Sequence, residues 1–383
     1  MKILTLNYEY PPMGGGGGVH AANLARELVQ RGHEVDYITT QYKGFPAQES
    51  IEGVRVFRES LPGRSHLHTA SITSMLFYPP FAVKRGLALG RITKYDVVHT
   101  HFAVPTGPGG YLLSKMLRLP NVLTVYGGDI YDPSKHYSPH KHPILRPTVK
   151  RVLNQASVVV PESDDLVQRI AQYYNPRTPV HKIPLGLEKP KFSPATRAEL
   201  GLSDDRIYAI AVARLISRKR FCDLLHAFAQ ANVPALNLLI IGDGPEENSL
   251  RDQARELGIA DRVQFLGAIW GPKKFQYLHA SDFFVLASSH EGFGIVYEEA
   301  MYCGLPVVTT NVGGQTDFLV HDQNALLVSP LDVASLAAAI RLMGTDENMR
   351  SKMKQANIRD IQLLMMSNTA ADYVRLFESV IRH

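Results

Sequence analysis

Two glutamates, Glu291 and Glu299, lie eight residues apart in the segment 288–314. Glu291 opens the turn Glu-Gly-Phe-Gly, whose two glycines let backbone amides approach a ligand closely. A helical pattern begins at Ile295, directly behind this turn. A helix N-terminus in that position favours a phosphate, because its unpaired amides and its dipole attract negative charge. Ionised carboxylates only accept hydrogen bonds, so the two glutamates suit the hydroxyls of a sugar or a ribose.

The whole segment resembles the nucleotide-sugar glycosyltransferases with a GT-B fold, in particular glycosyltransferase family 4, whose members are retaining enzymes. Their signature is E-x7-E with a glycine after the first glutamate, then E-A-M-x-x-G-x-P-V-V and V-G-G. The matching positions are Glu291, Gly292, Phe293, Gly294, Glu299, Ala300, Met301, Gly304, Pro306, Val307 and Val308. The resemblance implies that Glu299 binds ribose hydroxyls and that Glu291 binds hydroxyls of the donor sugar. The donor-binding turn between them would consist of Gly292, Phe293, Gly294 and Ile295.

Alternating strands and helices position these residues. In the second half, strands are expected at 207–212, 236–241, 263–266 and 283–287, and helices at 221–230, 246–257 and 273–279. In the first half, strands are expected at 2–8, 34–40, 96–102, 121–125 and 156–160, with a helix at 19–31. Such alternation predicts parallel sheets with helices on both faces. We therefore expect an α/β chain of two Rossmann-like, doubly wound domains that face a central cleft.

The length of 383 residues also exceeds that of one typical domain. We place an N-terminal acceptor-binding domain at residues 1–188 and a C-terminal domain for the nucleotide-sugar donor at 189–367. An amphipathic helix is expected at 370–382. The resemblance implies a GT-B architecture in which the C-terminal segment 368–383 crosses back and packs on the first domain.

Further donor-binding positions follow strands of the second half. The family pattern G-R-L-x-x-x-K is matched at Arg214 and Lys219, which in the family hold the donor diphosphate; a solvated basic turn is the alternative. A leaving diphosphate gains negative charge as the glycosidic bond breaks, so fixed cations stabilise the transition state more than the ground state. The family's F-L-G ends here at Gly267, and the resemblance implies nucleobase contacts by Ala268 and Ile269.

Five consecutive glycines, residues 14–18, follow the first strand. They match the dinucleotide fingerprint G-x-G-x-x-G only weakly. In the family this loop faces the donor phosphate and the acceptor, so the resemblance implies donor contacts by Gly15, Gly16 and Gly17. A flexible surface loop is the alternative.

Polar residues end two strands of the first half, where open α/β sheets place their sites. The segment Asp-Val-Val-His-Thr-His resembles the family's D-V-V-H-x-H, which puts His101 near the acceptor pocket; a structural histidine is the alternative. Where the family commonly has H-G-x-D, this chain has Tyr126 in place of the sugar-contacting histidine, and Asp129 keeps its position. A tyrosine is a poor base near neutral pH. The candidate catalytic residues are thus Glu291, Arg214, Lys219, His101 and Asp129, and the candidate acceptor contacts are Tyr126, Asp129 and His101.

The charge is unevenly distributed. Residues 1–185 carry 21 Lys and Arg against 13 Asp and Glu, whereas residues 186–383 carry 20 against 23, which gives net charges of +8 and −3 and +5 overall. A basic first half favours an anionic membrane surface or an anionic acceptor. No nucleic-acid motif accompanies the charge, so nucleic acid is not expected as a partner. Basic and aromatic residues mix at 61–94, including His66 and His68, and fit interfacial membrane binding and an ordinary surface helix equally.

Several features bear on compartment and cofactors. No apolar run reaches about eighteen residues and the start turns polar quickly, so neither a transmembrane helix nor a signal peptide is expected. Cys222 and Cys303 form no CxxC. These features favour the cytoplasm, and the basic first half allows peripheral attachment to the inner face of the cytoplasmic membrane. Metal-binding D-x-D is absent, so no metal cofactor is expected; the spacing of His136, His140 and His142 suits a metal, but the prolines among them argue for an irregular loop.

We therefore expect a retaining glycosyltransferase that moves a sugar from a nucleotide-diphosphate-sugar to an acceptor hydroxyl. The acceptor would be a glycan or a lipid-linked molecule, in glycan, glycolipid or cell-envelope polysaccharide synthesis. Two alternatives stay open. Sugar-nucleotide epimerases share the GT-B fold, although the glutamate pair and the basic motif favour a transferase. A non-catalytic nucleotide-sugar binding subunit is conceivable because Tyr126 replaces the family histidine.

Overall fold

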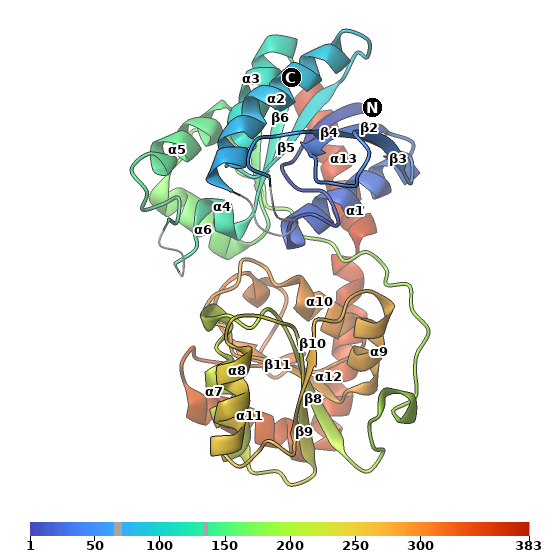
Figure 1. Ribbon diagram of the computed structural model, residues 1–383, viewed down its shortest axis with the longest axis vertical. Coiled ribbons are helices and arrows are strands. Elements are labelled where there is room, and N and C mark those ends of the chain that lie inside the picture. The colour runs from blue at the N-terminus through green and yellow to red at the C-terminus, as the bar shows by residue number, and fades with distance from the viewer. Residues whose placement is uncertain (65–70, 134–136, 383) are drawn as a thin grey trace. The chain divides into compact units, whose positions relative to one another are not determined.

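A computed structural model describes residues 1–64, 71–133 and 137–382. His66, His68 and His136 lie outside these described residues. The chain forms two compact units: unit 1 is Met1–Glu188 together with Met365–His383, and unit 2 is Lys189–Leu364. Each unit contains one sheet with helices packed on it (Figure 1). Within the described ranges, no helix is both long and apolar enough to cross a membrane.

Unit 1 is built on a seven-stranded sheet in the order β3-β4-β2-β1-β5-β6-β7. The strands are β1 (Lys2–Leu6), β2 (Glu34–Thr40), β3 (Gln48–Ile51), β4 (Val54–Glu59), β5 (Val97–His101), β6 (Asn121–Val125) and β7 (Val158–Pro161). The helices are α1 (Gly16–Gln30), α2 (Ile72–Gly90), α3 (Gly107–Leu117), α4 (Gly127–Ile130), α5 (Leu145–Gln155), α6 (Asp164–Tyr173) and α13 (Met366–Arg382). Only β3 runs antiparallel to its neighbour among the described strands of this sheet. Helices connect the parallel strands, as is usual for parallel pairing, except that the segment containing β3 joins β2 to β4.

The two faces of this sheet are covered by different helices. Ile3 of β1 packs in a buried cluster with residues of α1 and α13. Its neighbour Leu4 packs in a second cluster with residues of α2 and α3. This division follows because successive side chains of a strand point to opposite faces. The C-terminal helix α13 lies beside α1 (Figure 1), and the hydroxyl of Tyr373 is 2.8 Å from that of Thr124 in β6.

Unit 2 is built on a six-stranded parallel sheet in the order β10-β9-β8-β11-β12-β13. The strands are β8 (Ile207–Val212), β9 (Leu236–Ile241), β10 (Val263–Gly267), β11 (Phe283–Leu286), β12 (Val307–Thr310) and β13 (Ala325–Val328). The helices are α7 (Phe221–Ala231), α8 (Glu247–Glu256), α9 (Pro272–Ala280), α10 (Ile295–Tyr302), α11 (Val333–Thr345) and α12 (Glu347–Asp360). Short 3-10 turns are η1 (Ala198–Leu200), η2 (Ser217–Lys219), η3 (Gly314–Asp317) and η4 (Ile361–Leu364). The expected doubly wound α/β alternation is confirmed in both sheets.

Several expected boundaries are wrong. The first helix begins at Gly16, inside the glycine run and not at Val19. Glycine has a low helix propensity, so the sequence pattern did not predict this first turn. Packing requires a glycine at position 17, because a Cβ there would lie 2.6 Å from the ring of Phe102. The last strand of unit 1 begins at Val158 and not at Ala156. Strands β3 and β4 were not expected. The short edge strand β3 is half exposed and contains no continuous apolar run that would indicate a strand.

Candidate functional site

The strand order of unit 2 reverses between β8 and β11, which are hydrogen-bonded neighbours. Strand β8 leads into Arg214 and then η2, which ends at Lys219; strand β11 leads into the turn 288–294. Open α/β sheets bind ligands beyond the carboxyl ends of their strands, at the point where the order reverses. The two donor-binding motifs therefore meet where this topology places a ligand site.

Two glycines of the β9–α8 loop pack closely against the backbone on both sides of Arg214. A Cβ on Gly242 would lie 1.9 Å from the carbonyl oxygen of Ala213, and one on Gly244 would lie 2.3 Å from that of Leu215. Both glycines have positive φ as well, so a side chain is excluded by backbone conformation and by space. The Arg214 side chain is exposed, and no described acidic residue forms an ion pair with it.

Lys219 and Glu291 form an ion pair between the ends of β8 and β11. The Nζ atom of Lys219 donates to Oε1 of Glu291, and Oγ of Ser288 donates to the same oxygen over 2.6 Å. The two charged side chains are only 13% and 6% exposed. Burial alone would raise the pKa of Glu291, but the charges of Lys219 and Arg218 and the hydrogen bonds from Lys219 and Ser288 hold the pKa below its usual value. Glu291 is therefore ionised at neutral pH, and its Oε2 atom accepts no hydrogen bond from the described residues.

The turn after Glu291 is fixed from two sides. Gly294 has a φ of +88° and caps the start of α10. Phe293 is buried against Phe318, with ring centroids 5.0 Å apart. From the next loop, Gly313 approaches so closely that a Cβ there would lie 2.2 Å from the carbonyl oxygen of Glu291. In the first turn of α10, which begins at Ile295, the amide of Tyr297 donates to the carbonyl oxygen of Gly294 over 2.9 Å. The amides of Ile295 and Val296 have no acceptor within the helix and can bind a ligand.

Glu299 lies in α10 and pairs with Lys274 of α9 over 2.5 Å. The side chains are 13% and 15% exposed. Lys274 was not identified from the sequence, because the two residues belong to different helices and no motif links them. The lysine fixes the carboxylate that the family resemblance assigns to the ribose.

The expected nucleobase contacts lie in the loop that leads into α9, the helix of Lys274. Strand β10 ends at Gly267, which has a φ of +71°. Ala268 is exposed and Ile269 is half-buried, and the loop continues through Trp270 into α9. Trp270 is the only tryptophan of the chain and is 77% exposed. The same loop thus connects the expected base contacts with the helix that carries Lys274.

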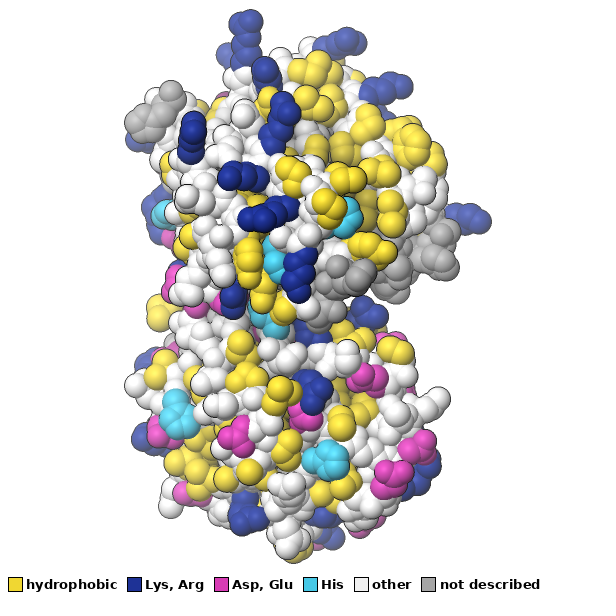
Figure 2. Space-filling view, turned by 90° about the vertical axis from the view of Figure 1, so that its left-hand side faces the viewer, with side chains coloured by type: hydrophobic (Ala, Val, Ile, Leu, Met, Phe, Trp, Pro, Cys, Tyr) yellow, Lys and Arg dark blue, Asp and Glu magenta, His cyan; other side chains and the backbone are white. Residues whose placement is uncertain are grey.

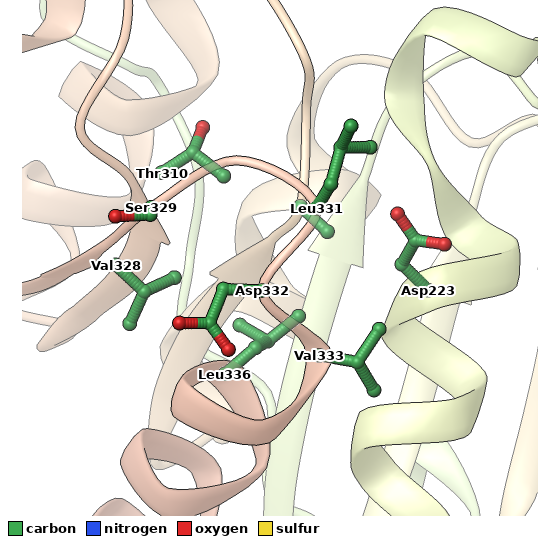
Figure 3. Close-up of a pocket in the computed structure, with 9 residues that line it drawn as sticks. Asp223, Thr310, Val328, Ser329, Leu331, Asp332, Val333 and Leu336 are labelled. Carbon is green, nitrogen blue, oxygen red and sulfur yellow. The ribbon is translucent and has the colours of Figure 1, made fainter.

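A separate hollow in unit 2 is too small for a sugar (Figure 3). It lies near the ends of β12 and β13 and is lined by Asp223, Ala287, Thr310, Val328, Ser329, Leu331, Asp332, Val333 and Leu336. Its volume of about 10 Å³ is about what one water molecule needs. The carboxylate of Asp223 is also engaged by Arg220 over 2.7 and 2.8 Å. This hollow is therefore not a donor site.

In unit 1 the strand order reverses between β1 and β5. Helix α1 follows β1, and its first residues Gly16 and Gly17 and the preceding Gly15 lie at the carboxyl edge of the sheet. The amide of Gly15 donates to a carboxylate oxygen of Glu9 over 2.9 Å. The glycine motif thus occupies the ligand-binding edge of unit 1, as His101 at the end of β5 also does.

The structure brings His101, Tyr126 and Asp129 together at this edge. The Nδ1 atom of His101 is 2.8 Å from the hydroxyl of Tyr126. Asp129 accepts the amide of Tyr126 over 2.8 Å and the amide of Ala103 over 2.5 Å, so it fixes the ends of β5 and β6. The three side chains are at most 5% exposed. Burial lowers the pKa of His101 well below its usual value and raises that of Tyr126, so both are uncharged at neutral pH.

Two further histidines, not identified from the sequence as site residues, join this group. The rings of His99 and His101 are in contact, with centroids 4.1 Å apart and a tilt of 48° between the ring planes, and the Nε2 atom of His99 is 2.9 Å from Oγ1 of Thr124. His20 of α1 is buried beside Tyr126, with ring centroids 6.1 Å apart. Burial lowers the pKa of His20 to about 4 and that of His99 to about 3. Strand periodicity would have revealed His99, since residues two apart on a strand share a face.

His140 and His142, which the sequence spacing suggested as metal ligands, form hydrogen bonds to nearby residues. The Nδ1 atom of His140 is 2.7 Å from Oγ of Ser138. The Nδ1 atom of His142 accepts the amides of Ile144 and Leu145, each over 3.3 Å, at the start of α5. Within the described ranges, no group of three or more His, Cys, Asp or Glu side chains could hold a metal ion.

Comparisons with known proteins agree with this architecture. The glycosyltransferase family 4 model matches residues 14–189, and the glycosyl transferases group 1 model matches residues 192–360. An uncharacterized glycosyltransferase of Methanocaldococcus jannaschii is 29% identical over 99% of this chain and 98% of its own length.

Solved structures share the fold over the whole chain. Sucrose-phosphate synthase of Thermosynechococcus elongatus has a TM-score of 0.87 at 23% identity and covers 100% of this chain and 99% of its own. Anabaena HepE in complex with UDP-glucose has a TM-score of 0.78 at 22% identity and covers 99% of this chain and 100% of its own. The chain therefore belongs to the GT-B glycosyltransferases, with a family 4 domain followed by a group 1 domain.

Proposed function

We propose that the protein is a retaining glycosyltransferase that moves a sugar from a nucleotide-diphosphate-sugar to an acceptor hydroxyl. The observation that carries the proposal is the Lys219–Glu291 pair at the point of strand reversal in unit 2. The pair places a cation and an ionised hydrogen-bond acceptor side by side. A negatively charged leaving group and a hydroxylated sugar need these two groups. Family membership supports the same reaction class.

The donor would lie along the carboxyl edge of the unit 2 sheet. Arg214 and Lys219 hold the diphosphate, together with the amides of the Phe293–Gly294 turn. The unused Oε2 atom of Glu291 accepts hydroxyls of the sugar. A nucleotide-sugar donor is also supported by the GT-B relative HepE, which was solved with UDP-glucose.

The nucleoside end of the donor would lie toward α9 and α10. Glu299 accepts the ribose hydroxyls, and Lys274 holds its carboxylate in place. The backbone of Ala268 and Ile269 borders the base. These assignments rest on the family resemblance. They agree with the chain order, in which the β10–α9 loop leads into the helix that contacts Glu299.

In the reaction, the acceptor oxygen forms a bond to the anomeric carbon while the bond from that carbon to the phosphate oxygen breaks. The leaving phosphate oxygen takes the proton of the acceptor hydroxyl, so no protein nucleophile takes part. Arg214 and Lys219 stabilise the charge that develops on the diphosphate. Because these two cations neutralise the leaving group, we propose that transfer needs no metal.

The acceptor would bind at the carboxyl edge of unit 1. Tyr126 is a neutral hydrogen-bond donor and not a base, because burial raises its pKa well above the usual value. His101 accepts or donates through a neutral ring, and Asp129 positions the backbone. Gly15, Gly16 and Gly17 would let donor or acceptor come close to the backbone. We place the protein in the cytoplasm, with a glycan or lipid-linked acceptor.

Thermal unfolding with a panel of nucleotide sugars tests the donor proposal. A matching donor at about a hundred times its Kd stabilises the folded state by about 2.7 kcal/mol. If no nucleotide sugar or nucleoside diphosphate raises the melting temperature, the donor proposal is wrong.

Two variants test the site itself. Lys219→Ala and Glu291→Ala should each reduce transfer by at least about a hundredfold, because each removes a group that acts on the transition state or holds the sugar. Arg255→Ala and Asp252→Ala are the matched controls, since they break an exposed ion pair of unit 2 with 67% and 60% side-chain exposure. Full activity of both site variants would contradict the assignment.

A further inference from the structure

Two helices of unit 1 expose large apolar side chains to solvent. We call this surface, residues 72–94 and 107–118, the α2–α3 face. Ile72 and Leu76, one turn apart in α2, are 76% and 71% exposed. The other exposed apolar side chains on the two helices are Met75, Phe77, Leu112 and Met116. Several large exposed apolar side chains on two packed helices of one folded unit indicate an interaction surface.

The two helices form one continuous surface. A Cβ on Gly86 of α2 would lie 2.4 Å from Leu113 of α3, and one on Gly90 would lie 2.7 Å from Leu117. The glycines therefore allow α2 and α3 to pack closely along their length. Tyr78 of α2 is fully buried against the sheet, whereas Ile72 and Leu76 lie on the side of the helix that faces away from it.

The charged side chains of the α2–α3 face are all Lys or Arg. Residues 60–128 contain seven Lys and Arg but only one acidic residue, Asp96. Asp96 accepts the amide of Lys2 at the base of the sheet. No described acidic residue forms an ion pair with the five basic residues Lys84, Arg91, Lys94, Lys115 and Arg118. Figure 2 shows hydrophobic side chains and Lys or Arg side chains together on unit 1, where Asp and Glu are sparse.

The apolar end of α2 lies at the ligand-binding edge of unit 1. The hydroxyl of Ser74 is 2.6 Å from that of Tyr8, which follows β1. The amide of Tyr8 in turn donates to Thr106 at the start of α3 over 3.3 Å. Ile72, Leu76 and their neighbours are therefore at the same edge of the sheet as the glycine motif and His101.

We propose that the α2–α3 face binds an anionic lipid bilayer, with the apolar end of α2 inserted in the interfacial region and the basic residues on the headgroups. Exposed apolar side chains and unpaired cations on the same two helices, without acidic residues among them, match the two layers of such a surface. The proposal deepens the proposed function, because it places the acceptor-binding edge of unit 1 at the membrane and so names a membrane-borne acceptor as the substrate class.

A second copy of the chain fits this surface less well. A twofold contact would bring the same surface of each copy together, and both surfaces carry the unpaired basic residues. Like charges facing each other across an interface oppose association. An anionic bilayer instead supplies the opposite charge and an apolar layer.

Co-sedimentation with lipid vesicles tests the proposal. The full chain should bind vesicles of phosphatidylcholine with phosphatidylglycerol at low salt, bind pure phosphatidylcholine much less, and dissociate from the anionic vesicles at high salt. Lys84→Ala, Arg91→Ala and Lys94→Ala together should weaken binding by about a hundredfold, at about fivefold per charge. Ile72→Ser with Leu76→Ser should weaken it by at least about tenfold.

Matched controls come from exposed residues of unit 2. Lys352→Ala, Lys354→Ala and Arg359→Ala remove the same number of lysines and arginines, and Ile358→Ser with Leu363→Ser removes two exposed apolar side chains. Both controls should bind vesicles like the unaltered chain. Insertion is measured separately: in a Trp270→Phe background, Leu76→Trp should show a blue-shifted emission on anionic vesicles, and Leu363→Trp should not.

The outcomes separate this inference from the proposed function. No binding of the unaltered chain to anionic vesicles, or equal binding by all variants, overturns it. Self-association that Ile72→Ser with Leu76→Ser abolishes, without vesicle binding, assigns the face to a second copy and also overturns it. Nucleotide-sugar binding, measured by calorimetry, should be the same in the α2–α3 variants. Vesicle binding without any donor binding would contradict the proposed function but would still support membrane binding by the α2–α3 face.

Discussion

The two units contain polar side chains at corresponding edges of their sheets but keep them in different charge states. In unit 2, Lys219 with Glu291 and Lys274 with Glu299 form ion pairs that are largely shielded from solvent. In unit 1, His101 and its buried histidine neighbours are uncharged, since burial lowers their pKa values. Fixed cations suit a diphosphate, and the uncharged histidine rings suit hydroxyls. This contrast supports the proposal that unit 2 stabilises charge and that the histidine and tyrosine side chains of unit 1 bind the acceptor by uncharged hydrogen bonds.

The largest expected effect comes from closing the space beside Glu291. Gly313→Ala puts a Cβ within 2.2 Å of the Glu291 carbonyl oxygen at a φ of +93°, so the turn must move. We expect transfer to fall by at least about a hundredfold and unfolding free energy to fall by about 2–4 kcal/mol. Gly258→Ala is the control, because Gly258 also has a positive φ, +65°, but nothing lies within 4 Å of its added Cβ. Equal effects of the two variants would show that backbone strain alone, and not the Glu291 turn, decides activity.

Acid should weaken unit 1 through its buried histidines. The unfolded chain binds protons at these imidazoles below about pH 6.5, whereas folded His20 and His99 have pKa values of about 4 and about 3. Stability that is present above pH 6.5 is therefore lost as the pH falls, by on the order of 2 kcal/mol per histidine at about pH 5.

Hydrogen exchange measures this loss locally. Protection factors, which correct for the slower intrinsic exchange in acid, should fall on acidification more for the β5 and β6 amides than for those of β8 and β9 in unit 2. His20→Leu should reduce the difference. An equal fall in both units would contradict the assignment of acid sensitivity to the histidines.

A smaller effect is expected at the second ion pair of unit 2. Lys274→Met removes the partner of Glu299 but keeps most of the side-chain volume, so the carboxylate loses its fixed orientation. We expect KM for the donor to rise by about tenfold with little change in kcat, because the ribose is not at the reacting bond. Lys354→Met, an exposed lysine of the same unit, is the control. A fall in kcat without a change in KM would place Lys274 near the reaction instead.

The smallest expected effect is spectroscopic. Trp270 follows the expected base contacts and is 77% exposed. A nucleotide bound beside Ala268 and Ile269 should change its emission and reduce quenching by iodide. Glu299→Ala should abolish this response at the same nucleotide concentration, since the ribose contact is lost. An unchanged response in that variant would separate the base site from Glu299.

Most of the fold could be predicted from the sequence. The strands at 34–40, 121–125, 207–212 and 236–241 have their expected boundaries, because buried parallel strands are short apolar runs between turns. The start of α1 at Gly16 and the edge strand β3 could not be found in this way. Glycine helix turns and half-exposed strands have weak local patterns, and tertiary packing decides them.

The candidate site was predicted in parts. Glu291, Lys219 and Arg214 follow adjacent strands, as their motifs suggested, but the roles of the site residues in binding and transfer stay predictions. The partner of Glu299 and the histidines His20 and His99 were not expected. Lys274 and His20 lie on different elements from the residues that they contact, so no spacing rule connects them. His99 lies on the same strand as His101, and the two-residue periodicity of a strand could have revealed it.

The sequence by itself determined the alternating α/β pattern, the glycine turns and the charged residues that end the strands, because these depend on local conformation and side-chain type. Only the tertiary structure decided which charges pair. Lys219 and Glu291 are 72 residues apart, and Lys274 and Glu299 are 25 apart. The tertiary structure also decided that the histidines are neutral and that the apolar side of α2 faces solvent. The physical reason is that burial and ion pairing depend on the distances between elements, which the order of strands in the sheet sets and the chain order does not.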